Sequence, residues 1–198
     1  MRNRAALWTE HALLATGAVL LAGWAVVMLQ ARLYGLQQER RLERILHEPR
    51  PATPRRNRAA RKLRPMIASE DLVGRIEIPR LGLRAIVAEG VSAGTLRRAV
   101  GHLPGTALPG GDGNVVLAGH RDTFFRPLKD VRPGDAIELT TPEGRYGYRV
   151  EATQVVDPGR IDVLAAQGPP RLTLVTCYPF YLVGSAPDRF IVRAVQTR

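Results

Sequence analysis

The sequence predicts a mainly β domain, a closed or nearly closed β-barrel with one or two short helices, preceded by a single transmembrane helix. From Asp71 onward, apolar and polar residues alternate in short runs separated by turn signals. This alternation is typical of half-buried antiparallel strands, and many such short strands favour a barrel. Near the N-terminus, an uncharged run is long enough to span a bilayer. A length of 198 residues fits one domain with an appendage.

The uncharged run covers residues 12–29. As a helix, these 18 residues would extend about 27 Å, close to the thickness of the bilayer hydrocarbon. A cleaved signal peptide usually has a shorter apolar core, and Gln30-Ala31-Arg32 is a poor cleavage site. A buried helix of a soluble protein would have polar positions on one face, whereas this run is apolar all round. We therefore expect an uncleaved signal anchor at 12–29, with residues 1–11 in the cytoplasm.

Basic residues are concentrated before the β region. The chain carries a net charge of +11, but residues 1–66 hold 13 Lys and Arg against 4 Asp and Glu, and residues 67–198 hold 16 against 14. The domain thus lacks the basic excess of a nucleic-acid-binding domain, and no nucleic-acid partner is expected. Residues 30–66 are interpreted as a basic linker, whose segment 37–46 could continue as a short helix. Both a solvated spacer and a surface for anionic envelope polymers fit the rest of the linker.

Strands are predicted where the period-two alternation is clearest, at 74–78, 137–140 and 146–153. Turn signals at 133–135 and 142–144, each with proline and glycine, separate the last two strands from their neighbours. The best helix candidate within the domain is 92–100, where Ser92 is a suitable N-cap.

The only cysteine, Cys177, ends the apolar run Thr-Leu-Val-Thr-Cys at 173–177. Burial as a small apolar residue is the ordinary interpretation of a single cysteine. However, His120 ends an earlier apolar run and Arg189 begins a later one, each beside a loop. A thiol, a histidine and a cationic group together form a residue set for nucleophilic catalysis.

These residues resemble the sortase family, the membrane-anchored cysteine transpeptidases of bacterial envelopes. The family signature Thr-Leu-x-Thr-Cys with a downstream arginine is matched by residues 173–177 and Arg189. The sequences Gly-His-Arg-Asp at 119–122 and Tyr-Pro-Phe at 178–180 look most like the class D branch. The resemblance extends from about Asp71 to the C-terminus. It implies a mainly antiparallel, eight-stranded barrel as the catalytic domain, residues 67–198.

The resemblance also implies a function. Sortases cleave a C-terminal sorting signal of surface proteins, here expected to be Leu-Pro-x-Thr-like, and transfer the acyl group through a thioacyl-enzyme to an amine of the cell envelope or peptidoglycan. The implied location is the cytoplasmic membrane, crossed once, with an extracytoplasmic catalytic domain. Charge alone does not decide the orientation, because Arg2 and Arg4 favour a cytoplasmic N-terminus whereas the basic segment 37–65 opposes it.

The residue chemistry assigns the roles. Cys177 is expected to be the nucleophile, since the thiolate is the reactive form of cysteine. His120 is the expected acid and base, and Arg189 supplies N–H donors for the substrate carbonyl and the oxyanion. Thr176 is expected to support the oxyanion pocket. If the strands of Cys177 and Arg189 are antiparallel neighbours, these two residues meet across the intervening loop.

Several alternatives stay open. His120 could cap a turn, Arg189 could pair with Asp188 or Asp122, and His102 could contact substrate from another loop. A thiol hydrolase that uses water and a non-catalytic envelope-binding module remain alternative functions. No metal-ligand spacing stands out and no cofactor is expected; some sortases are helped by calcium, but no acidic cluster here is assigned to it. Loops 157–171 and 178–188 are expected to wall a groove for an apolar, Pro-containing peptide.

Overall fold

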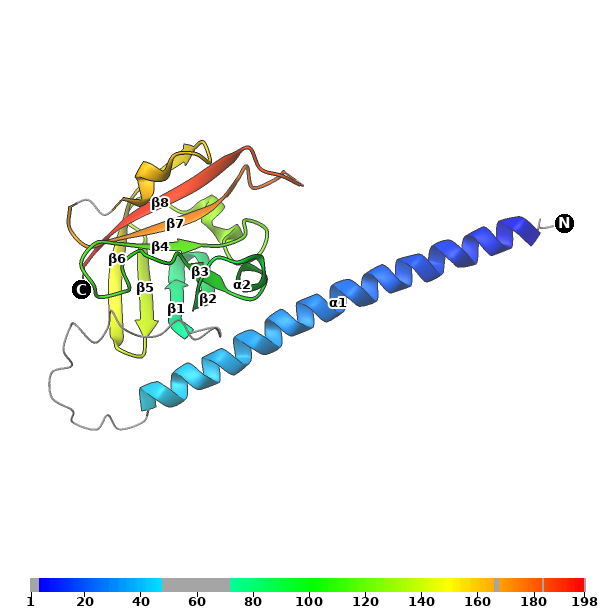
Figure 1. Cartoon of the computed structure of the whole chain (residues 1–198), viewed down its shortest axis with the longest axis horizontal. Coiled ribbons are helices and arrows are strands. Elements are labelled where there is room, and N and C mark those ends of the chain that lie inside the picture. Colours follow the sequence, from blue (N-terminus) through cyan, green and yellow to red (C-terminus); the bar gives the residue numbers. More distant parts are fainter. Residues whose placement is uncertain (1–3, 48–71, 166–167, 183, 198) are drawn as a thin grey trace.

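The computed structural model describes residues 4–47, 72–165, 168–182 and 184–197. Figure 1 shows a barrel near the C-terminal end of one long helix. The long helix is α1 (Arg4–His47), and α2 (Ala93–Arg98) is short. The strands of the described residues are β1 (Leu72–Ile78), β2 (Leu83–Glu89), β3 (Val100–His102), β4 (Asn114–Ala118), β5 (Ala136–Thr141), β6 (Gly144–Val156), β7 (Arg171–Tyr178) and β8 (Asp188–Gln196). Three 3₁₀ turns lie among the described residues, η2 (Pro79–Leu81), η3 (Arg126–Asp130) and η4 (Ile161–Leu164).

The strands close into a barrel in the order β1-β2-β3-β4-β7-β8-β6-β5. Neighbouring strands are antiparallel except in the pairs β2 with β3 and β4 with β7, which are parallel. The expected mainly antiparallel, eight-stranded barrel is therefore confirmed for the described residues. The parallel pair β4 with β7 matters for the site, because parallel neighbours end at the same edge of the sheet.

Alternation along the strands fills the barrel. Ile76 and Ile78 of β1 and Leu172 and Leu174 of β7 are fully buried in one apolar cluster. Burial of such a side chain contributes roughly 1.5–3 kcal/mol. The predicted strands at 74–78, 137–140 and 146–153 lie within β1, β5 and β6.

The alternation of apolar and polar residues does not predict strands β2 and β3. For β2, the reason is that both of its faces are buried. In β2, Ala85 and Val87 face the barrel core, while Ile86 and Ala88 pack into a second apolar cluster outside it. A strand buried on both faces reads as a continuous apolar run rather than as an alternating one. The predicted N-cap is confirmed, because the Ser92 hydroxyl accepts a 3.1 Å hydrogen bond from the Thr95 amide. However, α2 ends at Arg98, and Val100 already begins β3.

Helix α1 contains the expected membrane span and continues well beyond it. Its most apolar 18-residue window has a mean hydropathy of 2.2, and none of that window is buried in the protein, so α1 is long and apolar enough to cross a membrane. The helix does not break at residue 30, where the linker was expected to begin, but continues to His47. The part of the expected linker from 48 to 66 lies outside the described residues.

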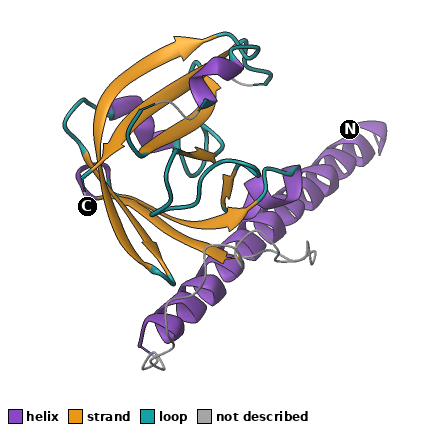
Figure 2. Cartoon of the chain, turned by 60° about the vertical axis from the view of Figure 1, so that its left-hand side comes forward, coloured by secondary structure: helices purple, strands orange, loops and turns teal. Residues whose placement is uncertain are grey.

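The C-terminal part of α1 docks against the barrel (Figure 2). Glu43 forms an ion pair with Arg75 of β1 at 2.9 Å, and Glu39 forms one with Arg84 of β2 at 2.9 Å. Nearer the apolar part of the helix, the Tyr34 ring lies 5.1 Å below the guanidinium of Arg98, at the end of α2. These contacts fix the direction in which the helix leaves the domain.

Candidate active site

The thiol and the predicted cation lie opposite one another. Strands β7 and β8 are antiparallel, and their register pairs Cys177 with Arg189. The condition under which these two residues were expected to meet, antiparallel neighbouring strands, is thus fulfilled. Directly opposite residues of a sheet share a face, so the Cys177 and Arg189 side chains lie on the same side of the sheet. Both residues are half-buried.

The histidine lies at the same edge of the sheet. Strand β4 runs parallel to β7, with Ala118 paired with Val175. Two residues further along each chain lead to His120 and Cys177. The amide of Gly119 continues the pairing by donating a 3.1 Å hydrogen bond to the carbonyl of Val175. The fold therefore brings His120, Cys177 and Arg189 to one edge of three neighbouring strands.

Thr176 has a structural task that the sequence does not predict. Its side chain is 2% exposed, and its hydroxyl donates a 2.7 Å hydrogen bond to the carbonyl of Gly119. The hydroxyl proton expected to support the oxyanion is thus engaged inside the barrel wall. Thr176 directly precedes Cys177, and Gly119 directly precedes His120. The bond between them therefore links the two strand ends that carry the thiol and the histidine.

The turn after His120 is tightly packed. The carbonyl of His120 accepts a 3.0 Å hydrogen bond from the amide of Phe125, whose ring is fully buried. A Cβ atom on Gly119 would lie 2.8 Å from that ring, closer than real Cβ atoms approach a neighbour. The position before the histidine therefore requires glycine for its lack of a side chain.

Arg189 uses part of its guanidinium to hold its own loop. Its Nη1 donates to the carbonyl of Asp188 at 2.9 Å and to that of Ala186 at 3.3 Å. Within the described part of the chain, no ion pair joins Arg189 to the carboxylates of Asp188 or Asp122. These backbone contacts hold the guanidinium at the start of β8, where Arg189 is paired with Cys177.

Arg121 is a site residue that sequence reasoning misses. It follows His120 directly and is 8% exposed. Its Nη2 donates to the carbonyls of Leu182 and Gly184, at 2.6 and 2.7 Å, so it fastens the loop between β7 and β8 to the histidine turn. The only sequence signal for Arg121 is its place in the Gly-His-Arg-Asp motif, since its partners lie more than 60 residues away.

Aromatic rings brace the same loop from the other side. The chain leaves β7 through a cis bond between Tyr178 and Pro179. Phe180 then packs edge-to-face on Tyr178 and on Phe190, with ring centroids 6.0 and 5.3 Å apart. Tyr178 and Phe190 adjoin Cys177 and Arg189 in the sequence, so this cluster supports both residues.

His102 occupies a buried structural position and is 2% exposed. Its Nδ1 lies 2.7 Å from a carboxylate oxygen of Glu89, and its Nε2 lies 2.9 Å from the carbonyl of Ala107. Burial alone would lower the pKa of His102, but the hydrogen bonds to Glu89 and Ala107 outweigh it and raise the pKa above its ordinary value. With an acceptor at both ring nitrogens, His102 braces β3 against the loop that follows it.

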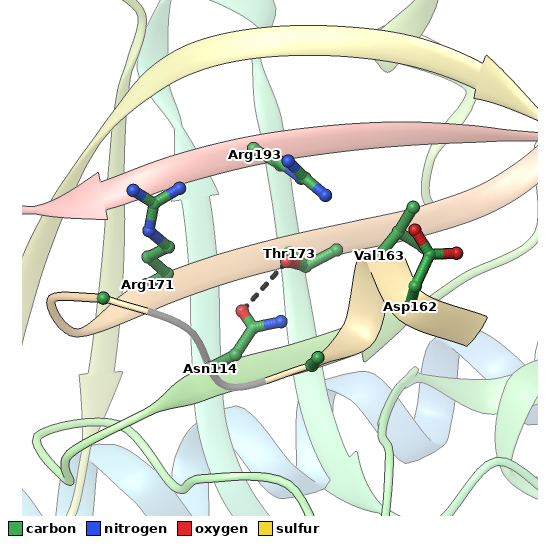
Figure 3. Close-up of a pocket in the computed structure, with 8 residues that line it drawn as sticks. Asn114, Asp162, Val163, Arg171, Thr173 and Arg193 are labelled. Carbon is green, nitrogen blue, oxygen red and sulfur yellow. Dashed lines mark hydrogen bonds between the residues drawn. The ribbon is translucent and has the colours of Figure 1, made fainter. Parts of the chain in front are cut away.

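A polar cavity of about 250 Å³ opens on the face of β7 and β8 that carries Cys177 and Arg189. Figure 3 shows Arg171, Thr173 and Arg193 rising from these strands, with Asp162 and Val163 of η4 at the side. The cavity thus lies under the loop between β6 and β7, which was expected to wall the groove. In the expected wall 157–171, Val163 of η4 is buried, and in the expected wall 178–188, Val183 lies outside the described residues.

Among the described residues, no group of three or more His, Cys, Asp or Glu side chains is arranged to hold a metal ion. The expectation of a site without a cofactor stays a prediction.

The strand order and the three-residue edge define a barrel with a thiol, a histidine and an arginine at one end. The sequence matches the Sortase domain family over residues 76–197, and the chain belongs to the sortase family. It is 37% identical over 120 residues to Sortase D of Bacillus subtilis (strain 168), a match that covers 60% of this chain and 61% of that protein. It is 33% identical over 110 residues to Sortase A of Listeria monocytogenes, covering 54% of this chain and 49% of that protein. The chain thus spans about half to three-fifths of these curated relatives, and the similarity is class D-like.

Solved structures support the same family. The fold matches that of a Clostridium perfringens Sortase D5 transpeptidase with a TM-score of 0.60 and 31% identity, covering 66% of this chain and 82% of that one. It also matches Clostridium perfringens sortase C solved with the C-terminal cell wall sorting motif, with a TM-score of 0.61 and 31% identity, covering 67% and 74% of the two chains.

Proposed function

We propose that this protein is a membrane-anchored cysteine transpeptidase that cleaves a Leu-Pro-x-Thr-like sorting signal of surface proteins and joins it to an envelope amine. The observation that carries the proposal is the pairing of Cys177 with Arg189 beside the strand that ends at His120. Nucleophile, acid and oxyanion donor are the three groups that acyl transfer from an amide requires.

The first half-reaction forms a thioacyl-enzyme. The Cys177 thiolate attacks the scissile carbonyl carbon, a sulfur–carbon bond forms, and the oxygen becomes an oxyanion. The guanidinium N–H groups of Arg189 that its loop does not use stabilise this charge. As the carbon–nitrogen bond breaks, protonated His120 gives its proton to the leaving amine.

The second half-reaction releases the acyl group. An envelope amine attacks the thioester while neutral His120 takes its proton, so the histidine returns to its protonated form. The thiolate then leaves and the enzyme is regenerated. Side chains fill every role, so the proposal includes no cofactor and no metal.

Features of the fold and one relative support a substrate groove beside Cys177. The parallel pair β4 with β7 forms its floor, and the loops after β6 and β7 form its walls. A structure of Clostridium perfringens sortase C includes the C-terminal sorting motif, which supports a peptide substrate of this kind here. Helix α1 is proposed to hold the domain on the outer face of the cytoplasmic membrane, where surface proteins and amine acceptors meet.

Mass spectrometry of products from a peptide library, with and without an added amine, tests the proposal. We expect amine-dependent ligation products from the intact protein, and none from Cys177→Ala, because the chain has no second thiol. Circular dichroism of Cys177→Ala checks that the domain stays folded. Cleavage that ignores the amine would indicate a thiol hydrolase, and no Cys177-dependent product from any peptide would overturn the enzymatic proposal.

A further inference from the structure

The polar cavity beside the candidate active site has an unbalanced charge. Its charged lining residues are Arg171, Arg193 and Asp162. Asp162 is held by Arg160 outside the lining, through contacts of 2.7 and 2.9 Å. Arg171 lies 3.3 Å from Glu151. Among the described residues, Arg193 forms no ion pair, and the three arginines Arg160, Arg171 and Arg193 outnumber the two carboxylates Asp162 and Glu151.

Two further features equip the cavity for an anionic group. The Nε of Arg171 is buried and has no hydrogen-bond partner among the described residues. A buried donor without a partner is unfavourable, so an acceptor that reached it would be favoured. Asp162 does not supply that acceptor, because hydrogen bonds from Arg160 lower its pKa and hold its carboxylate, with a smaller contribution from the charge of Arg193.

The floor of the cavity is preformed. The Thr173 hydroxyl donates a 2.9 Å hydrogen bond to Oδ1 of Asn114 (Figure 3). The Nδ2 of Asn114 donates to the carbonyl of Leu164 at 3.1 Å. These polar groups are already paired with each other, so the floor does not compete for the arginines. A ligand entering the cavity therefore meets guanidinium donors above a rigid, satisfied surface.

The cavity lies at a defined distance from the nucleophile. Thr173 pairs with Arg193, just as Cys177 pairs with Arg189 four residues later, and all four side chains share one face. At about 3.3 Å per residue, four strand residues span about 13 Å. An extended substrate acylated at Cys177 would therefore place its fourth residue from the scissile one at the cavity.

We propose that Arg193, with Arg171, binds an acidic side chain of the substrate, an Asp or Glu four residues N-terminal to the residue that acylates Cys177. This inference rests on the proposed transpeptidase function. In a Leu-Pro-x-Thr-like signal, that position immediately precedes the Leu.

The cavity is assigned to the substrate segment N-terminal to the scissile bond, because this segment remains on the enzyme throughout the reaction. The acyl segment stays bound to the enzyme through both half-reactions, whereas the segment beyond the scissile bond leaves as an amine. Contacts with the acyl segment therefore hold the substrate in place for both steps, and they add binding without touching the reacting atoms.

Peptide binding to the full chain carrying Cys177→Ala tests the inference without turnover. Peptides differing only in the residue before the motif, Glu, Gln or Lys, are titrated by fluorescence anisotropy in detergent. We expect the Glu peptide to bind about tenfold more tightly than the Gln peptide, as for a charge-assisted hydrogen bond. The preference should shrink between 50 and 300 mM salt, because ions screen a partly exposed pair.

Charge reversal provides the decisive comparison. Arg193→Glu should prefer the Lys peptide over the Glu peptide, and Arg193→Gln should show no charge preference. Arg145→Glu makes the same change in net charge on an exposed part of β6 and should keep the wild-type preference. The inference would be overturned by equal affinity of the wild-type site for the Glu and Gln peptides. An unchanged preference for the Glu peptide in Arg193→Glu would overturn it as well. Loss of all ligation with this binding preference intact would instead count against the proposed function.

Discussion

The hydroxyl of Thr176 donates a 2.7 Å hydrogen bond to the carbonyl of Gly119, and the bond is buried. It joins two residues 57 positions apart, one before Cys177 and one before His120. The relative position of Cys177 and His120 thus depends on the wall of the barrel beneath them.

Replacing Thr176 with valine should therefore damage both stability and turnover. Thr176→Val keeps the side-chain shape but leaves the buried carbonyl of Gly119 without its donor, at a cost of about 1–3 kcal/mol in the free energy of unfolding. Thr176→Ser should retain most of both properties. Urea unfolding and peptide-cleavage rates measure the two effects. The matched control is Thr140→Val, which removes another buried hydroxyl far from the site and should lower stability alone; wild-type turnover in Thr176→Val would contradict the positioning role.

Loss of Arg121 should release the loop between β7 and β8. Arg121→Gln removes two charge-assisted hydrogen bonds, to the carbonyls of Leu182 and Gly184. Tyr181 in that loop is 85% exposed, so chymotrypsin cleavage after it reports on loop opening. We expect cleavage to accelerate roughly tenfold, as for the loss of about 1.4 kcal/mol or more of loop stabilisation, and turnover to fall. Arg126→Gln, an exposed arginine in η3, should leave the cleavage rate unchanged, and equal rates in both variants would show that Arg121 does not hold the loop.

Arg189→Lys should lose most activity although the charge is kept. The guanidinium holds two loop carbonyls through Nη1 and still has other N–H groups for the substrate, whereas a single ammonium cannot do both. Loss of an oxyanion donor typically lowers turnover about 100–1,000-fold. Steady-state kinetics should show the loss in kcat. Arg145→Lys, which is exposed on β6, is the control, and a mild loss of similar size in both variants would make Arg189 a structural residue.

The buried pair of His102 and Glu89 should make stability depend on pH. The folded-state pKa of His102 is raised, so its contribution is fully present below the unfolded value of about 6.5 and is lost as the pH rises through the folded value. The melting temperature of the wild type should exceed that of His102→Asn by more at pH 5.5 than at pH 9. Glu89→Gln removes the anion and should flatten this dependence. A constant difference across the pH range would mean that folding does not change the pKa of His102.

Orientation in the membrane is tested with reporter fusions. Alkaline phosphatase fused after Pro65 should be active, because the proposed function places the domain outside the cytoplasm. A fusion before residue 12 should be inactive. Activity of a cytoplasm-only reporter after Pro65 would show that the basic segment 37–65 had set the opposite topology.

Much of the architecture is readable from local patterns. Alternation in 74–78 and 146–153 reflects strands with one face in the core, and the uncharged run reflects a helical segment whose apolar window no part of the protein buries. Cys177, His120 and Arg189 stand out because each adjoins an apolar run at a loop, and their residue types match acyl-transfer chemistry. Composition and periodicity suffice here, because these features depend only on neighbouring residues.

Other features depend on residues that are distant in the sequence. Strand β2 is hidden because both of its faces are buried, one in the core and one in the outer cluster with Tyr34 of α1. Helix α1 carries the docking pairs of Glu39 and Glu43, although nothing near them in sequence indicates their partners on β1 and β2.

The pairing of Cys177 with Arg189 was expected if their strands were neighbours, but that condition depended on the sheet order. Local sequence patterns do not predict three of the contacts around the site. These are the parallel pairing of β4 with β7, the hydrogen bond from Thr176 to Gly119, and the hydrogen bonds from Arg121 to the loop between β7 and β8. Each of these contacts joins segments that are distant in the sequence and come together in space only when the barrel closes. Local sequence therefore determines which residues can carry the chemistry, and barrel closure determines that they meet, because register is a property of paired strands rather than of either strand alone.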